Sequence, residues 1–267
     1  MFSSVSRALA ILQFLARQEG GVSASEIAAA TDTEKSAVSR ILATLESEKY
    51  IVRGHGNLYF IGLKFVSMGI LQLEITGLFQ LCLPVLQKIA DGSGELVQLA
   101  IADAEGLHYI AKADGKERVR VEPRLGTRAP LHATAVGKVW LASLPEESAL
   151  KVALTAGLEA HTPNTITSIE RLRRDLRRVR REGFAFNGEE TFIGVNGIAI
   201  PVMGRNESVV TGAIVIVAPA FRMDVKRALS LLPLMREQAE QLRGVECLRR
   251  NGELAMPPRR QDLSLTG

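Results

Sequence analysis

Residues 23–62, SASEIAAATDTEKSAVSRILATLESEKYIVRGHGNLYFIG, decide the fold that we expect for the start of the chain. Ser23 and Glu26 have the spacing of a capping box, in which a hydroxyl and a carboxylate satisfy free amides at a helix start. The small and apolar residues that follow continue this start as a short helix over 24–30.

The next helix carries the apolar spacing of a buried face. Thr33 follows a polar turn and is expected to cap a helix over about 34–49. Apolar residues three and four positions apart predict its inward face, namely Val38, Ile41, Leu42 and Leu45. Residues 50–52 and 58–61 then read as two short strands around a glycine-rich turn, which predicts a hairpin.

A helix before this stretch completes the unit. A serine at position 3 or 4 can cap a helix that runs to about residue 18 and ends before two glycines. We expect its buried stripe to comprise Val5, Leu9, Leu12 and Leu15. Three helices, the second and third joined by a short turn, followed by a hairpin, predict a winged helix-turn-helix over residues 1–62.

The third helix of such a unit fits the major groove and presents the residues near its start to base edges. The predicted partner is therefore a double-stranded DNA operator. We expect groove contacts from Lys35, Ser36, Ser39 and Arg40. The start of the second helix offers free amides to a phosphate, together with the hydroxyls of Ser23 and Ser25. Further backbone contacts are expected from Arg7, Arg53 and His55. Use of the same fold for protein contacts alone is the alternative.

Net charge does not decide this question. The chain has a formal charge of +4, but residues 1–62 hold six basic and six acidic side chains. The excess lies in residues 170–182, with seven arginines against three acids. This segment is predicted as a solvated helix face, with a secondary DNA contact as the alternative.

Composition indicates a globular protein, because 46% of the residues are hydrophobic and 23% are charged. No apolar run reaches the roughly 20 residues that span a bilayer. The first residues lack a signal-peptide cleavage pattern, so we expect no export, no membrane partner and a cytoplasmic location. Two distant cysteines, Cys82 and Cys247, predict neither a disulfide framework nor a zinc site. His108 and His161 lack partners at ligand spacing, so no metal is expected.

The rest of the chain predicts an α+β fold with a mostly antiparallel sheet. Residues 62–72 form an apolar linker helix, and Pro84 interrupts a helix over 76–90. Strands are expected at 95–103, 106–113, 118–121, 198–203 and 209–218. Helices are expected at 135–143, 145–154, 168–182 and 224–249. The expected divisions are a DNA-binding domain (1–62), a helical linker (63–75), an effector-binding domain (76–250) and a flexible tail (251–267).

Several stretches together resemble the isocitrate-lyase-regulator (IclR) family of transcriptional regulators. In the first domain they are SRALAIL (6–12), SEIA (25–28), EKSAVSRILATL (34–45) and YFIGLK (59–64). Further on they are PLHATAVGK (130–138), EE (189–190), GV (194–195) and IAIPV (198–202). The resemblance implies a C-terminal GAF-like effector domain that binds a small organic acid. It also implies a homodimer, formed largely through the DNA-binding half and linker and often paired into a dimer of dimers. We expect no cofactor.

The same resemblance implies the ligand-binding residues. The loop and helix start that would receive the ligand contain His132, Thr134, Ala135, Val136 and Gly137. A helix start suits a carboxylate, because it offers unpaired amides and a partial positive charge. The alternatives are a tight loop that merely permits packing and a histidine with a structural hydrogen bond.

Four further positions depart from the residues that the family commonly has there. Asn187 and Gly197 stand where an aspartate and a cysteine are common, and Val215 and Val217 stand where serines are frequent. The pocket should therefore be less polar and, at Gly197, wider. We expect a ligand with a larger apolar body than glyoxylate or pyruvate, such as an aromatic acid. The alternative is that both valines are plain core residues.

These expectations combine into a ligand-responsive regulator, a repressor of a catabolic operon. The alternative from another class is an enzyme that acts on a small metabolite through the C-terminal domain. The sequence shows no nucleophile elbow and no paired metal ligands, which argues against the enzyme.

Overall fold

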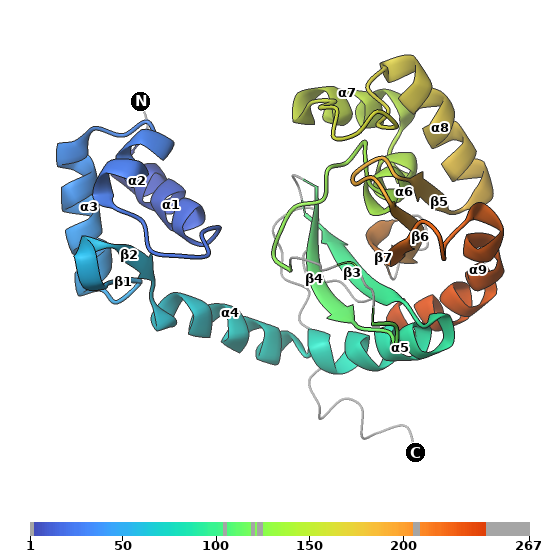
Figure 1. Ribbon diagram of the computed structural model, residues 1–267, viewed down its shortest axis with the longest axis horizontal. Coiled ribbons are helices and arrows are strands. Elements are labelled where there is room, and N and C mark those ends of the chain that lie inside the picture. Colours follow the sequence, from blue (N-terminus) through green and yellow to red (C-terminus); the bar gives the residue numbers. More distant parts are fainter. Residues whose placement is uncertain (1–2, 104–105, 119–120, 122–124, 205–208, 244–267) are drawn as a thin grey trace. The chain divides into compact units, whose positions relative to one another are not determined.

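The computed structural model describes residues 3–103, 106–118, 121, 125–204 and 209–243 (Figure 1). These residues divide into two compact units, one ending at Ile75 and the other beginning at Thr76. Residues 119–120, the middle of the predicted strand over 118–121, fall outside the described residues. So do the end of the predicted helix over 224–249 and the tail 251–267.

The first unit contains the three helices and the hairpin expected from the sequence. Its elements are α1 (Ser4–Leu15), α2 (Ala24–Ala30), α3 (Lys35–Ser47), β1 (Ile51–Arg53), β2 (Tyr59–Ile61) and α4 (Leu63–Thr76). β1 and β2 pair antiparallel, and Val22 forms a bridge to Tyr59 beside them. Ser3 caps α1, and both hydrogen bonds of the predicted capping box at Ser23 are present.

Two local expectations in this unit are wrong. Thr33 does not cap α3, because its hydroxyl donates to the Thr31 carbonyl (3.0 Å) and Glu34 occupies the N-cap position without a side-chain cap. Val5 and Leu9 are 66% and 54% exposed. The core of this small unit reaches only the second half of α1, where Ile11 and its neighbours are buried.

The second unit is built on a five-stranded sheet in which every neighbouring pair is antiparallel. The strand order is β4-β3-β7-β6-β5. The strands are β3 (Leu96–Ala102), β4 (Leu107–Ala113), β5 (Ala185–Gly188), β6 (Val195–Met203) and β7 (Val210–Pro219). The predicted α+β fold is confirmed. The short β5 was not predicted, because its four residues, AFNG, include a glycine and an asparagine that are unfavourable in strands.

Helices cover both faces of this sheet. On one face lie α5 (Leu78–Ser93) and α9 (Val225–Ala239), which pack together and against the strands. On the other face α6 (Ala135–Ser143) packs on β6 and β7, with α7 (Glu146–Ala156) and α8 (Ile169–Glu182) outside it (Figure 1). Pro84 lies inside α5 and does not interrupt it, contrary to the prediction. α9 is followed by a 3₁₀ turn over Glu240–Leu242.

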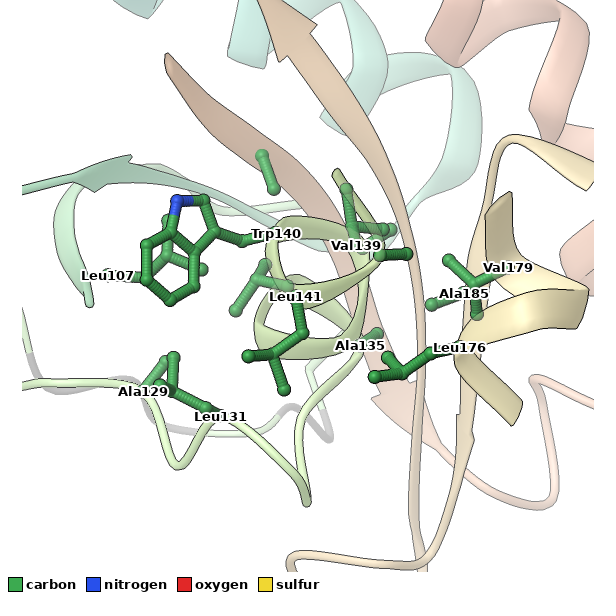
Figure 2. Packing of buried hydrophobic residues seen from close by; sticks show 14 of the residues in the cluster. Leu107, Ala129, Leu131, Ala135, Val139, Trp140, Leu141, Leu176, Val179 and Ala185 are labelled. Atoms are coloured by element: carbon green, nitrogen blue, oxygen red, sulfur yellow. The ribbon is translucent and has the colours of Figure 1, made fainter. Parts of the chain in front are cut away.

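The core beneath α6 organises this second face. Trp140 and Leu141 on α6 belong to one buried cluster with Leu176 and Val179 of α8 and Leu107 of β4 (Figure 2). Alternation along β7 places Ala213 and Val215 in the same cluster. The position of α6 against the sheet is therefore set by apolar packing from both sides.

No single helix among the described residues is long and apolar enough to cross a membrane. α4 and α5 pass that test only when they are taken together, by length and composition. Half of this pair is a core helix, since α5 buries residues including Leu86, Ile89 and Ala90.

Candidate functional site

The start of α3 presents the polar face expected of a recognition helix. All four predicted groove residues are exposed: Lys35, Ser36, Ser39 and Arg40. The Ser36 hydroxyl donates to a Glu34 carboxylate oxygen at 2.7 Å, which holds that carboxylate beside the helix start. The exposed side chains of Lys35, Ser39 and Arg40 are placed for phosphate or base contacts.

The start of α2 is less open than the sequence indicates. The Ser23 hydroxyl donates to Glu26 Oε2 (2.7 Å) and accepts from the Glu26 amide (3.3 Å). The hydrogen bonds that the Ser23 hydroxyl and the Ser23 backbone amide donate to this carboxylate lower the pKa of Glu26, so the carboxylate stays ionised. A carboxylate therefore occupies the position expected for a phosphate, and Ser25 is the more accessible hydroxyl of this turn.

The remaining predicted DNA contacts lie on the surface of the same unit. Arg53 ends β1, and its guanidinium lies 5.7 Å from the centroid of the Tyr59 ring. His55 is exposed in the 3₁₀ turn between the two hairpin strands, and Arg7 is exposed on α1. Each position is compatible with a phosphate contact.

The second unit contains a cavity of about 410 Å³ between the start of α6 and the sheet. Six of the nine predicted ligand-binding residues line it: Thr134, Ala135, Asn187, Gly197, Val215 and Val217. Val136 and Gly137 are buried in the helix behind the wall. Strand register explains the grouping, because Val217 pairs with Gly197, which in turn pairs with Asn187 on β5.

Gln98 is a lining residue that the sequence did not reveal. It pairs with Val215 across β3 and β7 and is only 6% exposed. Its side chain borders the cavity, and a buried amide normally has a hydrogen-bonding partner. The available signal was one polar residue in the otherwise apolar strand LVQLAIA. The Gln98 amide is suited to hydrogen-bond a ligand.

The start of α6 is shaped by backbone packing. The Thr134 hydroxyl accepts from the Gly137 amide (3.1 Å) and donates to the Pro130 carbonyl (2.8 Å). A Cβ at Gly137 would overlap the Leu131 backbone, so glycine permits this close approach. The side chain of Thr134 already uses one amide of this helix start. Fewer amides than expected are therefore available to bind a ligand carboxylate.

Asn187 holds the cavity wall together. Its side-chain amide donates to the Ala133 carbonyl and to the Thr191 hydroxyl, and its Oδ1 accepts from the Glu190 amide at 3.0 Å. The residue therefore fastens the loop after β5 to the loop before α6. An aspartate has no N–H group to donate in these bonds. Asn187, at a position where the family commonly has an aspartate, therefore allows these two loops to be joined.

A buried ion network lies directly behind this wall. Lys138 Nζ is 2.6 and 2.7 Å from the two Glu190 carboxylate oxygens and 2.9 Å from Asp175 Oδ2, and the residue is 1% exposed. Burial raises the pKa of the Glu190 carboxyl, and the Lys138 ammonium opposes that shift. Sequence reading missed this network, because its members are far apart in the chain.

The described lining contains basic side chains but no acidic ones. Arg128 and His161 contribute a guanidinium and an imidazole, whereas no aspartate or glutamate is present among the described lining residues. Burial raises the pKa of Tyr109 to about 12, an effect that a hydrogen bond with Thr134 partly opposes. This phenol is therefore a neutral group at the cavity, able to donate a hydrogen bond.

His132 does not line this cavity but a neighbouring cleft. Its Nε2 lies 2.9 Å from the Glu159 carbonyl oxygen, and its ring stacks on His161 at 5.7 Å between centroids. Burial lowers the pKa of His132, so the imidazole is neutral at pH 7. These contacts support the alternative in which His132 makes a structural hydrogen bond and does not contact the ligand.

This shift predicts a pH-dependent contribution to stability. The folded protein disfavours the protonated form of His132. The contribution of this residue to the free energy of unfolding is therefore complete above the unfolded pKa of about 6.5, and it is lost as the pH falls below that value. We expect the difference in melting temperature between wild type and His132→Gln to shrink from pH 7.5 to pH 5.5. A difference that stays constant or grows over that range would contradict the assignment.

The arginine-rich helix α8 is used in part for internal contacts. Arg177 forms a two-pronged ion pair with Glu146 of α7 at 2.7 and 2.8 Å. Arg180 donates to the carbonyls of Ala142 and Leu144 at 2.8 and 2.6 Å. The predicted solvated face is therefore also the surface that fastens α8 to α6 and α7.

Among the described residues, no group of three or more His, Cys, Asp or Glu is placed to hold a metal ion.

Comparisons with protein families match both units. Residues 4–55 match the IclR helix-turn-helix domain, and residues 71–243 match the C-terminal domain of bacterial transcriptional regulators of the IclR type. "Probable transcriptional regulator SauR" of Cupriavidus necator is 31% identical over 241 residues, covering 88% of this chain and 94% of that protein. "HTH-type transcriptional repressor AllR" of Salmonella typhi is 31% identical over 240 residues, with coverages of 90% and 88%. Both names describe regulators and not enzymes.

Solved structures give the same picture. The crystal structure of Thermotoga maritima IclR superposes with a TM-score of 0.68 at 28% identity, covering 90% of this chain and 96% of that one. A mutant inducer-binding domain of the transcription factor PobR from Acinetobacter, in complex with 3-hydroxybenzoic acid, superposes with a TM-score of 0.54. It is 27% identical and covers 60% of this chain and 93% of its own.

Proposed function

The chain belongs to the IclR family of bacterial transcriptional regulators, and on that premise we propose that it represses a catabolic operon until an aromatic acid or related derivative binds. It is a ligand-responsive DNA-binding regulator and not an enzyme. The observation that carries the proposed ligand class is the composition of the cavity wall. Gly197, Val215 and Val217 form a wide apolar side, and the basic residues Arg128 and His161 also line the cavity.

The neighbours support the two finer parts of this proposal. AllR, a relative over most of the chain, is named a repressor, which supports the sign of regulation. The PobR inducer-binding domain is described with a hydroxybenzoic acid, which supports an aromatic carboxylate for this cavity. A carboxylate near Arg128 and a ring against Val215 and Val217 would use both kinds of lining.

The proposed protein acts as a homodimer, and two dimers pair. The support lies in apolar side chains of the first unit that remain exposed. On α1 they are Val5 and Leu9, and on α4 they include Leu63 (78%), Ile70 (62%) and Leu71 (59%). Exposed apolar surface of this extent marks an interaction site. We propose residues 1–62 as the DNA-binding domain, 63–75 as the linker and 76–250 as the effector domain, in a cytoplasmic protein.

The proposed mechanism is a linkage between two binding sites. Ligand binding moves the start of α6, residues 135–137, toward the cavity. This movement changes how the effector domains of the dimer pair, and the new pairing changes the spacing of the two recognition helices. If the ligand prefers one arrangement of the dimer and the operator prefers the other, each weakens the binding of the other. The two effects are equal by linkage.

The ligand class predicts which compounds stabilise the protein. We expect benzoate and 4-hydroxybenzoate to raise the melting temperature, whereas glyoxylate and pyruvate should not, because they leave the apolar wall uncovered. Gly197→Leu should abolish this stabilisation by filling the cavity. Gly197→Ala is the matched control, since an added Cβ would make only ordinary contacts, the nearest at 3.5 Å. Stabilisation by two- or three-carbon acids alone would contradict the proposed ligand.

A further inference from the structure

One large aromatic side chain lies at the edge of the cavity. Phe192, in the loop between β5 and β6, lines the cavity and is nevertheless 63% exposed. Its neighbour Ile193 is also 63% exposed but is not part of the lining. An exposed phenylalanine has apolar surface still to be buried, and a ligand in the cavity would cover part of it.

The loop that carries Phe192 is fastened just before this residue. The Glu190 side chain is held by Lys138, and the Glu190 carbonyl accepts from the Thr165 hydroxyl at 2.6 Å. The Thr191 hydroxyl donates to the Ala133 carbonyl at 2.6 Å. Phe192 is therefore presented from a rigid base, which lowers the entropy lost when it contacts a ligand.

The loop is closed on its other side as well. The Gly194 amide donates to Glu189 Oε2 at 2.5 Å, and Gly194 adopts a left-handed φ of 80° that glycine tolerates. The turn so formed leads directly into Val195 at the start of β6, which also lines the cavity. Phe192 thus stands at the end of the wall formed by Val195, Gly197 and Val217.

We propose that Phe192 is a specificity-determining residue that covers the planar ring of an aromatic carboxylate bound in this cavity. This rests on the proposed function, whose ligand class it deepens. Aromatic rings prefer offset-stacked or edge-to-face contacts, and a saturated ring of the same size lacks the electron distribution that favours them. Phe192 therefore distinguishes flat acids from aliphatic acids of equal carbon count.

The test measures dissociation constants of full-length wild type, Phe192→Ala, Phe192→Leu and Ile193→Ala by calorimetry, with benzoate and cyclohexanecarboxylate as probes. Phe192→Ala is expected to weaken benzoate binding roughly ten- to hundredfold, from the lost apolar burial and ring contact. Phe192→Leu is expected to bind cyclohexanecarboxylate as wild type does but benzoate about tenfold more weakly. Ile193→Ala should match wild type for both probes, since it removes equally exposed surface outside the cavity.

The outcomes separate this inference from the function on which it rests. Wild-type binding of benzoate that Phe192→Ala leaves unchanged would overturn the role of Phe192 alone. Equal losses for both probes in Phe192→Leu would overturn the selectivity for flat rings. Failure of wild type to bind either probe, with operator binding intact, would overturn the proposed ligand class and this inference together.

Discussion

Replacing Lys35 and Arg40 together with alanine is expected to reduce operator affinity by at least tenfold, because a lost base contact costs about 1–3 kcal/mol and a lost phosphate contact weakens binding to all sequences. Both side chains are exposed at the start of α3, so their removal should leave the buried face of that helix, with Val38 and Leu42, intact. Gel shifts or fluorescence anisotropy on the upstream region of the gene, over a range of salt concentrations, would measure the loss.

The salt dependence separates the two kinds of contact. A lost phosphate contact lowers the slope of log affinity against log salt by about 1, whereas a lost base contact mainly relaxes sequence preference. Arg17→Ala is the matched control, since Arg17 is an exposed arginine of the same unit beyond the end of α1. An unchanged affinity and slope in the double variant would reject α3 as the recognition helix.

Replacing Lys138 with methionine is expected to destabilise the second unit by about 3–5 kcal/mol. Methionine fills a similar volume, but it leaves the Glu190 carboxylate buried without its cation. Trp140 is the only tryptophan of the chain and lies two residues away on α6, so its fluorescence during urea unfolding reports on this unit.

A second variant identifies charge as the cause. Adding Glu190→Gln to Lys138→Met should recover a large part of the lost stability, because Asp175 keeps its 2.5 Å ion pair with Arg178. Lys151→Met on the exposed side of α7 should have little effect. A Lys138→Met protein as stable as wild type would show that the network contributes nothing, and a double variant no better than the single one would point to packing instead.

The elements that the sequence predicted well are those with a strong local signal. The capping box at Ser23, the apolar spacing of α3 and the turn-flanked strands β3 and β4 each depend on residues within a few positions of one another. Elements with weak local signals were missed or misplaced. β5 forms only because β6 supplies its hydrogen bonds, and Pro84 stays inside α5 because the helix packs on the sheet and α9.

The candidate site divides in the same way. The exposed residues at the start of α3 could be named from the sequence, because helix periodicity alone decides which side of a helix faces outward. Among the cavity residues, the family resemblance supplied Asn187, Gly197, Val215 and Val217, and the structure shows that all four line one cavity. Gln98 could not be found in this way, since only the register of β3 against β7 brings it there.

By itself, the sequence determined the family, the two-part organisation and the positions of the capped helices, because caps, turns and periodicity act over short distances along the chain. Only the tertiary structure decided which side chains share the cavity, why Lys138 is buried and that Val5 and Leu9 are left exposed. Those outcomes depend on contacts between segments that are tens of residues apart. Such contacts follow from how the helices pack on the sheet and on one another, and no local pattern encodes them.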